Sequence, residues 1–140
     1  MIVTFCGHST VSNSAAVAAS LKSVIEELIA EGATEFYLGG YGEFDSLAAR
    51  AVRDAKKMHP EIRSTLVIPY MDRDFNTDFY DESVYPPLES VPRRFAISKR
   101  NEWMVDQSDI VVSGVTHDWG GAATTLKYAT RKKKRIISVV

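Results

Sequence analysis

The sequence has few of the residues that mark secreted or membrane proteins. Cys6 is the only cysteine in 140 residues, so no disulfide can form within the chain. No apolar run reaches the length needed to cross a membrane, and no signal peptide pattern is present. These absences predict a cytoplasmic protein without a disulfide scaffold and without a membrane partner.

Charge of one sign is also lacking. The formal net charge is -1, which gives no overall attraction to nucleic acid or to an anionic membrane. The one dense run, residues 131–135, is interpreted as a solvated helix end, where cations complement the helix dipole. Nucleic acid is therefore not an expected partner. The length and the hydrophobic content of 45% predict one globular domain over residues 1–140.

Two phosphate-binding signatures are missing. The sequence contains neither a Gly-Lys-Ser/Thr loop nor the GxGxxG fingerprint of dinucleotide-binding domains. His8 and His117 follow two predicted strands and could face each other, but no third metal ligand stands at a convincing spacing. We therefore expect no metal site and no cofactor, and we expect the histidines to form hydrogen bonds.

What the sequence does contain is an alternation of apolar strands with amphipathic helices. Strands are predicted at 1–6, 35–40, 64–71, 109–115 and 135–140, and helices at 15–32, 44–60, 97–108 and 122–133, with Ser98 as a cap. This alternation predicts a single α/β, Rossmann-like three-layer domain. Its sheet would have five mainly parallel strands in the order 3-2-1-4-5, with the ligand site between the first and fourth strands.

Residues 72–92 interrupt the alternation. The segment is acidic and aromatic, contains prolines and has no sustained periodicity. Loops of this length in small domains are often lids or binding loops. Disorder is the alternative, but its aromatic and aliphatic side chains favour a packed flap over or beside the pocket mouth.

Three strand exits are rich in glycine and small polar residues: 7–9, 39–42 and 114–121. Glycine lets a ligand approach the backbone amides closely, so three such loops at one sheet edge predict a site for a phosphate-bearing ligand. Tyr41 and Trp119 lie in these loops, where they would stack on a base or pack against the flap. Asp45 would cap its helix, bind a ribose or assist bond cleavage, and Arg93, Arg94, Arg100 and Asn101 could bind an anion.

Several segments together resemble the SLOG superfamily of Rossmann-like proteins, which includes DprA and the lonely-guy phosphoribohydrolases. They are "TFCGHS", "FYLGGYGEFDSLAARAV", "PRRFAISKRNEWMVDQSDIVV" and "THDWGGAATTLKYA", and the likeness is greatest to short bacterial and phage members. The resemblance implies a nucleotide-derived ligand above the strand ends and a homodimer. The ligand-binding candidates are Gly7, His8, Ser9, Gly39, Gly40, Tyr41, Gly42, Arg100, Thr116, His117, Trp119, Gly120, Gly121 and Thr124.

The lonely-guy pattern is matched only in part. Arg100, the pair Ser108-Asp109, Gly120, Gly121 and Thr124 fit it, but Ala123 replaces its third glycine. Lys127 stands where the resemblance places a catalytic glutamate, and an ammonium would oppose the positive charge of glycosidic cleavage. The sequence therefore favours a binding protein that senses or sequesters a nucleotide-derived molecule. The alternative is an N-glycosidase in which Asp45 supplies the missing carboxylate.

Overall fold

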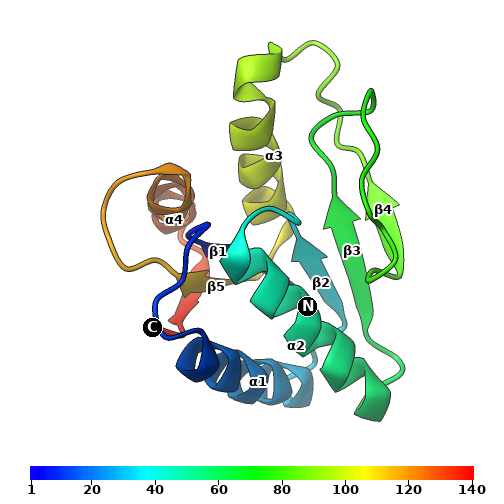
Figure 1. Cartoon of the computed structure of the whole chain (residues 1–140), viewed down its shortest axis with the longest axis vertical. Coiled ribbons are helices and arrows are strands. Elements are labelled where there is room, and N and C mark those ends of the chain that lie inside the picture. Colours follow the sequence, from blue (N-terminus) through cyan, green and yellow to red (C-terminus); the bar gives the residue numbers. More distant parts are fainter.

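The fold is a doubly wound α/β domain in which a parallel sheet lies between two pairs of helices (Figure 1). The computed structural model describes all 140 residues. Its elements in chain order are β1 (Ile2–Gly7), α1 (Ser14–Ala30), β2 (Glu35–Leu38), α2 (Glu43–Met58), β3 (Arg63–Val67), β4 (Glu82–Val84), α3 (Arg93–Gln107), β5 (Ile110–Gly114), α4 (Gly121–Arg131) and β6 (Arg135–Ser138).

The sheet has six strands in the order β4-β3-β2-β1-β5-β6, and every neighbouring pair is parallel. The predicted class and the order of the five predicted strands are confirmed, but the predicted number of strands is wrong because β4 was missed. The strand order reverses between β1 and β5, because β2 and β3 lie on one side of β1 and β5 and β6 lie on the other. The carboxyl ends of these two strands are therefore the expected place for a ligand.

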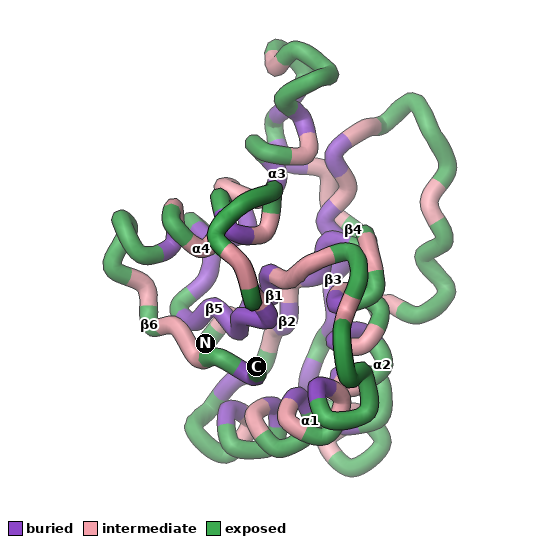
Figure 2. Tube along the Cα trace, turned by 60° about the vertical axis from the view of Figure 1, so that its left-hand side comes forward, coloured by how far each residue is buried: buried purple, intermediate pink, exposed green.

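The two faces of the sheet are covered unequally. A cluster of 18 buried residues joins α1 and α2 to one face, including Leu21, Ile25 and Phe36. On the other face, the cluster under α3 and α4 contains only Cys6, Val105, Val111 and Ala129 as buried members. Burial is concentrated along the strands, and the outer surfaces of the helices are exposed (Figure 2). No helix has the length and apolar character needed to cross a bilayer.

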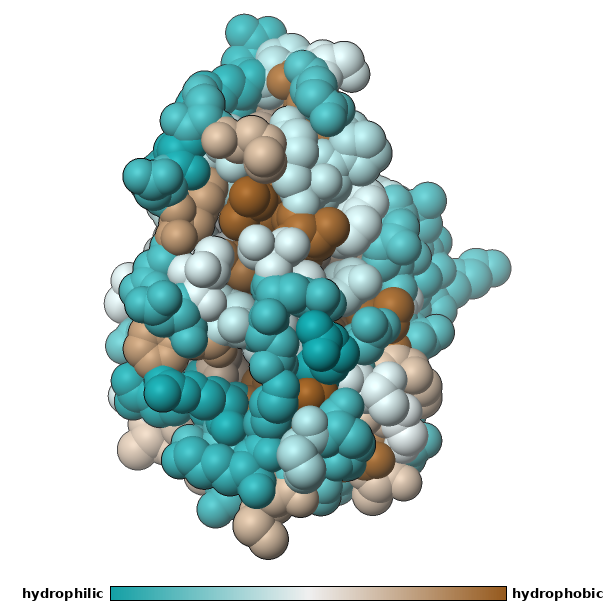
Figure 3. Space-filling model, turned by 90° about the vertical axis from the view of Figure 1, so that its right-hand side faces the viewer, coloured by the Kyte–Doolittle hydropathy of each residue, from teal (hydrophilic) through white to brown (hydrophobic).

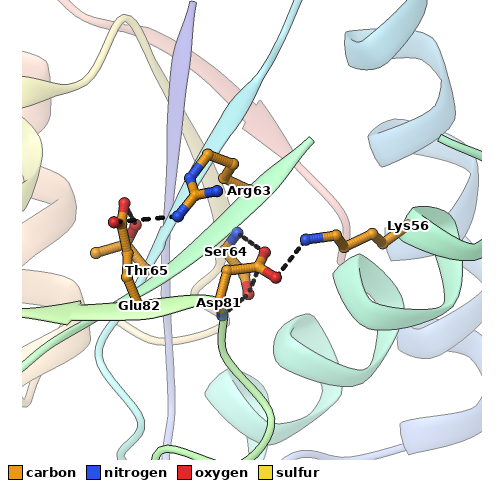
Figure 4. Close-up of polar contacts among 6 residues, drawn as sticks. All are labelled: Lys56, Arg63, Ser64, Thr65, Asp81 and Glu82. Carbon is orange, nitrogen blue, oxygen red and sulfur yellow. Dashed lines mark hydrogen bonds and ion pairs between the residues drawn. The ribbon is translucent and has the colours of Figure 1, made fainter. Parts of the chain in front are cut away.

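The connection from β3 to β4 contains no helix, which is unusual for a parallel crossover. Instead, polar side chains fix the end of this connection against β3 and α2. The Asp81 carboxylate accepts hydrogen bonds from the Ser64 amide at 2.8 Å and the Ser64 hydroxyl at 3.4 Å, and it pairs with Lys56 of α2 (Figure 4). The segment 72–92 thus contains a short ordered strand, Glu82–Val84, although no strand was predicted there.

The strand β4 itself is three residues long and is fixed by its first side chain. Glu82 accepts a hydrogen bond from the Thr65 hydroxyl at 3.1 Å and pairs with Arg63 at 3.2 Å (Figure 4). A short, charged strand protects an edge of the sheet from pairing with other chains. The molecular face seen from that side is mostly hydrophilic, with a small hydrophobic patch (Figure 3).

Helix α3 begins four residues earlier than predicted, at Arg93, so Ser98 lies inside the helix and does not cap it. Pro92 occupies the cap position with φ of -55°. Proline is well suited to the start of a helix, because its fixed φ is already near the helical value and it has no amide to leave unbonded. The added turn carries α3 beyond the carboxyl edge of the sheet (Figure 1).

Candidate functional site

A cavity of about 320 Å³ opens at the carboxyl ends of the central strands. It lies at the predicted site, between the exits of β1 and β5, and α3 forms one of its walls. The predicted residues that line it are Gly7, His8, Ser9, Tyr41, Asp45, Arg100, His117, Trp119, Gly120 and Gly121. The lining residues that the candidate list lacks are Phe5, Cys6, Thr10, Ile97, Asn101, Met104, Ala122 and Thr125.

Five predicted residues lie outside the lining: Gly39, Gly40, Gly42, Thr116 and Thr124. The glycines after β2 build the wall behind the cavity. A Cβ on Gly39 would lie 3.1 Å from the Asp45 carboxylate and 3.2 Å from the Arg100 guanidinium, and one on Gly42 would lie 2.7 Å from the backbone of Ser9. These glycines allow close packing of protein against protein, rather than contact with the cavity.

Gly7 is also explained by packing. It pairs with Gly114 in the register of β1 and β5, and a Cβ on either residue would lie 2.2 Å from the Phe44 ring. Phe44, at the start of α2, is fully buried. The ring therefore sits against the ends of both central strands, where it supports the floor of the cavity. Gly7 lines the cavity, but the requirement for glycine there comes from Phe44.

The amino-terminal end of α4 opens into the cavity. Gly120 precedes the helix with φ of 90° and ψ of 176°, and it makes no side-chain cap. The amides of Gly121, Ala122 and Ala123 donate to no protein acceptor, and no acidic residue occupies the first turn. A Cβ built on Gly120 or Gly121 would meet nothing within 4 Å. This end of the helix has free donors, positive potential and room for an anionic group.

Arg100 supplies a fixed positive charge beside that end. Its side chain is 2% exposed, and Nη1 donates to the carbonyl oxygens of Gly39 at 2.9 Å and Val67 at 2.7 Å. Nε donates to Asn101 at 2.9 Å, whereas Nη2 has no hydrogen bond within the protein. Burial lowers the pKa of Arg100, and the Asp45 carboxylate opposes that shift. The guanidinium is thus held rigidly with one nitrogen left for a ligand.

Asp45 is the only carboxylate that lines the cavity. Its Oδ2 accepts a hydrogen bond from the Tyr41 amide at 3.1 Å. Burial raises the pKa of Asp45 from 3.8 to about 6, although the Tyr41 hydrogen bond and the charge of Arg100 both oppose the rise. A carboxyl group with this pKa is available near neutral pH both as an acceptor and, in part, as a proton donor.

Three aromatic rings form a continuous stack at the rim. The His8 and His117 rings lie 3.6 Å apart between centroids, and His117 and Trp119 lie 3.8 Å apart. Nε2 of His8 accepts from the amides of Thr116 at 3.0 Å and His117 at 3.4 Å, so His8 carries its proton on Nδ1. Burial and the neighbouring His117 lower the pKa of His8.

This stack presents an aromatic surface at the rim of the cavity. Trp119 is 69% exposed at its end, so its outer face is open to a planar group. Nδ1 of His117 is buried without a hydrogen-bond partner. The rings of the two histidines lie face to face, and no cluster of three or more potential metal ligands exists in the chain.

No protein-family model matches the sequence. The uncharacterised SPbeta prophage-derived protein YoqJ of Bacillus subtilis strain 168 is 29% identical over 136 residues, with 79% of this chain and 78% of that protein covered.

Among solved structures, DprA of Streptococcus pneumoniae superposes with a TM-score of 0.71 at 17% identity, over 97% of this chain and 49% of that chain. DprA of Helicobacter pylori, whose single-stranded DNA binding mode is known, superposes with a TM-score of 0.69 at 16% identity, over 99% of this chain and 64% of that chain. The molybdenum cofactor binding protein of Rippkaea orientalis superposes with a TM-score of 0.68 at 18% identity, over 98% of this chain and 74% of that chain. This chain therefore spans about half to two thirds of the DprA chains, and the likeness establishes a shared fold.

Proposed function

We propose, on the premise that this chain has the SLOG-type Rossmann-like fold, that it binds a nucleotide or nucleotide-derived molecule as a cytoplasmic sensor or sequestering protein. The observation that carries the proposal is the amino-terminal end of α4. Its first amides have no protein acceptor, its first turn has no carboxylate, and it faces the same cavity as the free nitrogen of Arg100. Such an arrangement suits a phosphate group.

The rest of the cavity fits the other parts of a nucleotide. The exposed face of Trp119 suits a base, because aromatic stacking tolerates every nucleobase. Asp45 and Thr125 line the cavity; in this proposal Asp45 accepts hydrogen bonds from ribose hydroxyls, and Thr125 provides a further polar atom. A cavity of about 320 Å³ is at the lower end of the range for small-molecule sites.

The proposal is tested with Gly121→Val and a matched control, Thr124→Val. Gly121→Val adds a β-branched side chain in the first turn of α4, whereas Thr124→Val keeps one there, and only Gly121 lines the cavity. Because a Cβ at Gly121 meets no protein atom, the variant should fold normally while its side chain blocks the amides. Small molecules released from the purified protein are identified by mass spectrometry, and binding is measured by calorimetry. We expect Gly121→Val to weaken binding at least about tenfold and Thr124→Val less than about twofold.

A folded Gly121→Val protein that binds nucleotides as well as the wild type would contradict the assignment of a phosphate to this turn. A circular-dichroism melt of each variant establishes that it is folded.

The second candidate is nucleoside or nucleotide N-glycosidase activity, which the raised pKa of Asp45 favours. Lys127 stands in the position expected for a catalytic glutamate, and its Nζ donates to the Asp118 carbonyl at 3.0 Å, outside the lining of the cavity. The two candidates separate in the same incubations, because only an enzyme releases free base. For an enzyme, Asp45→Asn should abolish base release and largely preserve binding.

The proposal also includes a homodimer and no nucleic-acid partner. The net charge of -1 and the acidic segment 72–92 give little attraction for a polyanion. The H. pylori DprA binds single-stranded DNA and the R. orientalis protein binds the molybdenum cofactor. A single-stranded oligonucleotide and the molybdenum cofactor therefore belong among the ligands tested.

A further inference from the structure

One face of α3 extends from the cavity toward the flap. Ile97, Arg100 and Met104 line the cavity, and Arg93 is the preceding residue at the same helical spacing. Arg93 lies two turns before Arg100, about 10 Å along the helix axis. This first part of α3 rises above the carboxyl edge of the sheet beside the flap (Figures 1 and 2). The two arginines therefore lie along one wall, with Arg100 in the cavity and Arg93 beyond its mouth.

Arg93 is held by two residues from the segment that follows β3. Its Nη1 donates to both carboxylate oxygens of Asp72, at 2.8 and 2.6 Å, and its Cζ lies 4.0 Å from the centroid of the Tyr70 ring. The side chains of Arg93 and Asp72 are 57% and 69% exposed. Exposed pairs of this kind contribute little to stability and exchange readily, so another anion can replace the carboxylate.

The Tyr70 ring packs against the Arg93 guanidinium and helps to fix its position. The hydrogen bond from Arg93 lowers the pKa of Asp72, so the carboxylate is ionised at neutral pH. Arg94, by contrast, has no acidic partner and lies over Phe95, with its Cζ 4.8 Å from the ring centroid.

We infer that Arg93 is a second anion-binding residue of the site, and that Asp72 occupies it until an anionic group of the ligand displaces the carboxylate. The inference rests on the proposed function. It narrows the ligand class to nucleotides with a second anionic group, such as a further phosphate, that extends from the α4 amides and Arg100 toward the first turn of α3. Binding of that group releases Asp72 and so couples ligand length to the position of the flap.

The test uses two pairs of probes: inorganic phosphate against linear tripolyphosphate, and adenosine 5′-monophosphate against adenosine 5′-triphosphate. The inorganic pair makes the result independent of the base. The variants are Arg93→Gln, the matched control Arg94→Gln, and Asp72→Asn, with binding measured by calorimetry at one fixed salt concentration, because exposed pairs are screened by salt.

The wild type should prefer the longer probe of each pair. Arg93→Gln should weaken the longer probes about tenfold and the shorter ones less than about twofold, because it removes charge-assisted hydrogen bonds to one group. Arg94→Gln should change neither. Asp72→Asn should tighten the longer probes, since the competing charge is gone.

Equal losses in Arg93→Gln and Arg94→Gln, equal losses on long and short probes, or a wild type without preference for length would each overturn the inference. Gly121→Val separates it from the proposed function. If Gly121→Val abolishes binding of every probe while Arg93→Gln has no effect, the proposed function stands and the Arg93 subsite fails. If only Arg93→Gln has an effect, the α4 site fails. A wild type that binds none of the four probes overturns both.

Discussion

The amino-terminal ends of α2 and α4 have nearly the same backbone and opposite surroundings. Gly42 precedes α2 with φ of 90° and ψ of 174°, and Gly120 precedes α4 with φ of 90° and ψ of 176°. At α2, the first two amides donate to carbonyl oxygens of the loop after β1, at 2.9 and 3.3 Å. At α4, the corresponding amides have no protein acceptor. The amides that follow Gly42 are therefore satisfied within the protein, whereas those that follow Gly120 are free and face the cavity.

The starts of α2 and α4 also differ in charge and in free space, and both differences leave the start of α4 more open to an anion. The first turn of α2 contains Glu43 and Asp45, which complement the positive end of the helix, whereas the first turn of α4 contains no acid. A Cβ on Gly42 would lie 2.7 Å from the Cα of Ser9, and one on Gly120 would meet nothing. A glycine turn at a strand exit can accept an anionic ligand only where the protein does not satisfy the amides itself.

The largest expected effect is on the free energy of unfolding, which should fall more for a substitution at Gly42 than for one at Gly120. Both have a backbone conformation that only glycine adopts easily, so either alanine substitution causes strain. Gly42→Ala also forces its Cβ against Ser9. We expect losses of about 4 kcal/mol in the free energy of unfolding for Gly42→Ala and about 2 kcal/mol for Gly120→Ala, measured by urea denaturation. Equal losses would remove the distinction between a closed and an open turn.

The second largest effect concerns Asp45, the acidic residue in the first turn of α2 that lines the cavity. The folded-state pKa of Asp45 is about 6, against 3.8 for the free side chain, so folding disfavours its charge. The wild type therefore loses stability as the pH rises from about 4 to about 6. Asp45→Asn keeps an acceptor for the Tyr41 amide and does not ionise. It should match the wild type at pH 4 and exceed it by about 2 kcal/mol at pH 7.5.

Urea denaturation at the two pH values measures this difference. A stability difference between Asp45→Asn and the wild type that is the same at pH 4 and pH 7.5 would show that Asp45 does not have a raised pKa.

The smallest effect comes from making α4 resemble α2. Ala122→Glu places a carboxylate in the first turn of α4, where it interacts with the helix dipole. The variant should gain about 0.5 kcal/mol in thermal stability and lose affinity for phosphate-bearing ligands, because the new anion occupies the same potential. Ala122→Gln is the neutral control and should show neither change. Unaltered ligand affinity in Ala122→Glu would mean that the open end of α4 attracts no anion.

Much of the fold was predictable because its central strands are apolar and alternate with amphipathic helices. The strand β4 was not, because "ESV" has no apolar run, and its position depends on contacts of Asp81 and Glu82 with β3 and α2. The start of α3 was placed too late because Ser98 resembles a cap. Pro92 preceding Arg93 was the local signal that would have corrected it.

The place of the cavity was predictable, but its detailed lining was not. Sequence patterns locate glycine-rich strand exits, but they do not reveal that Phe44 lies against Gly7, because the two residues are brought together only by tertiary packing. For His8 and His117, the sequence predicted only that the two histidines could face each other, and not that their rings would stack. Ile97 and Met104 were missed, although their helical spacing from Arg100 indicates a shared face.

The stack of His8 on His117 also has a consequence for how the chain folds. The hydrogen bond between them joins residues 109 positions apart, and the pairing of β1 with β5 beneath it has similar separation. Contacts so distant in sequence carry a large loop-closure cost and tend to form late. Partly folded molecules that hold only α1, α2 and the strands β1 to β3 therefore lack the cavity entirely. Ligand affinity would then report completion of folding, and bound ligand would stabilise the last contacts to form.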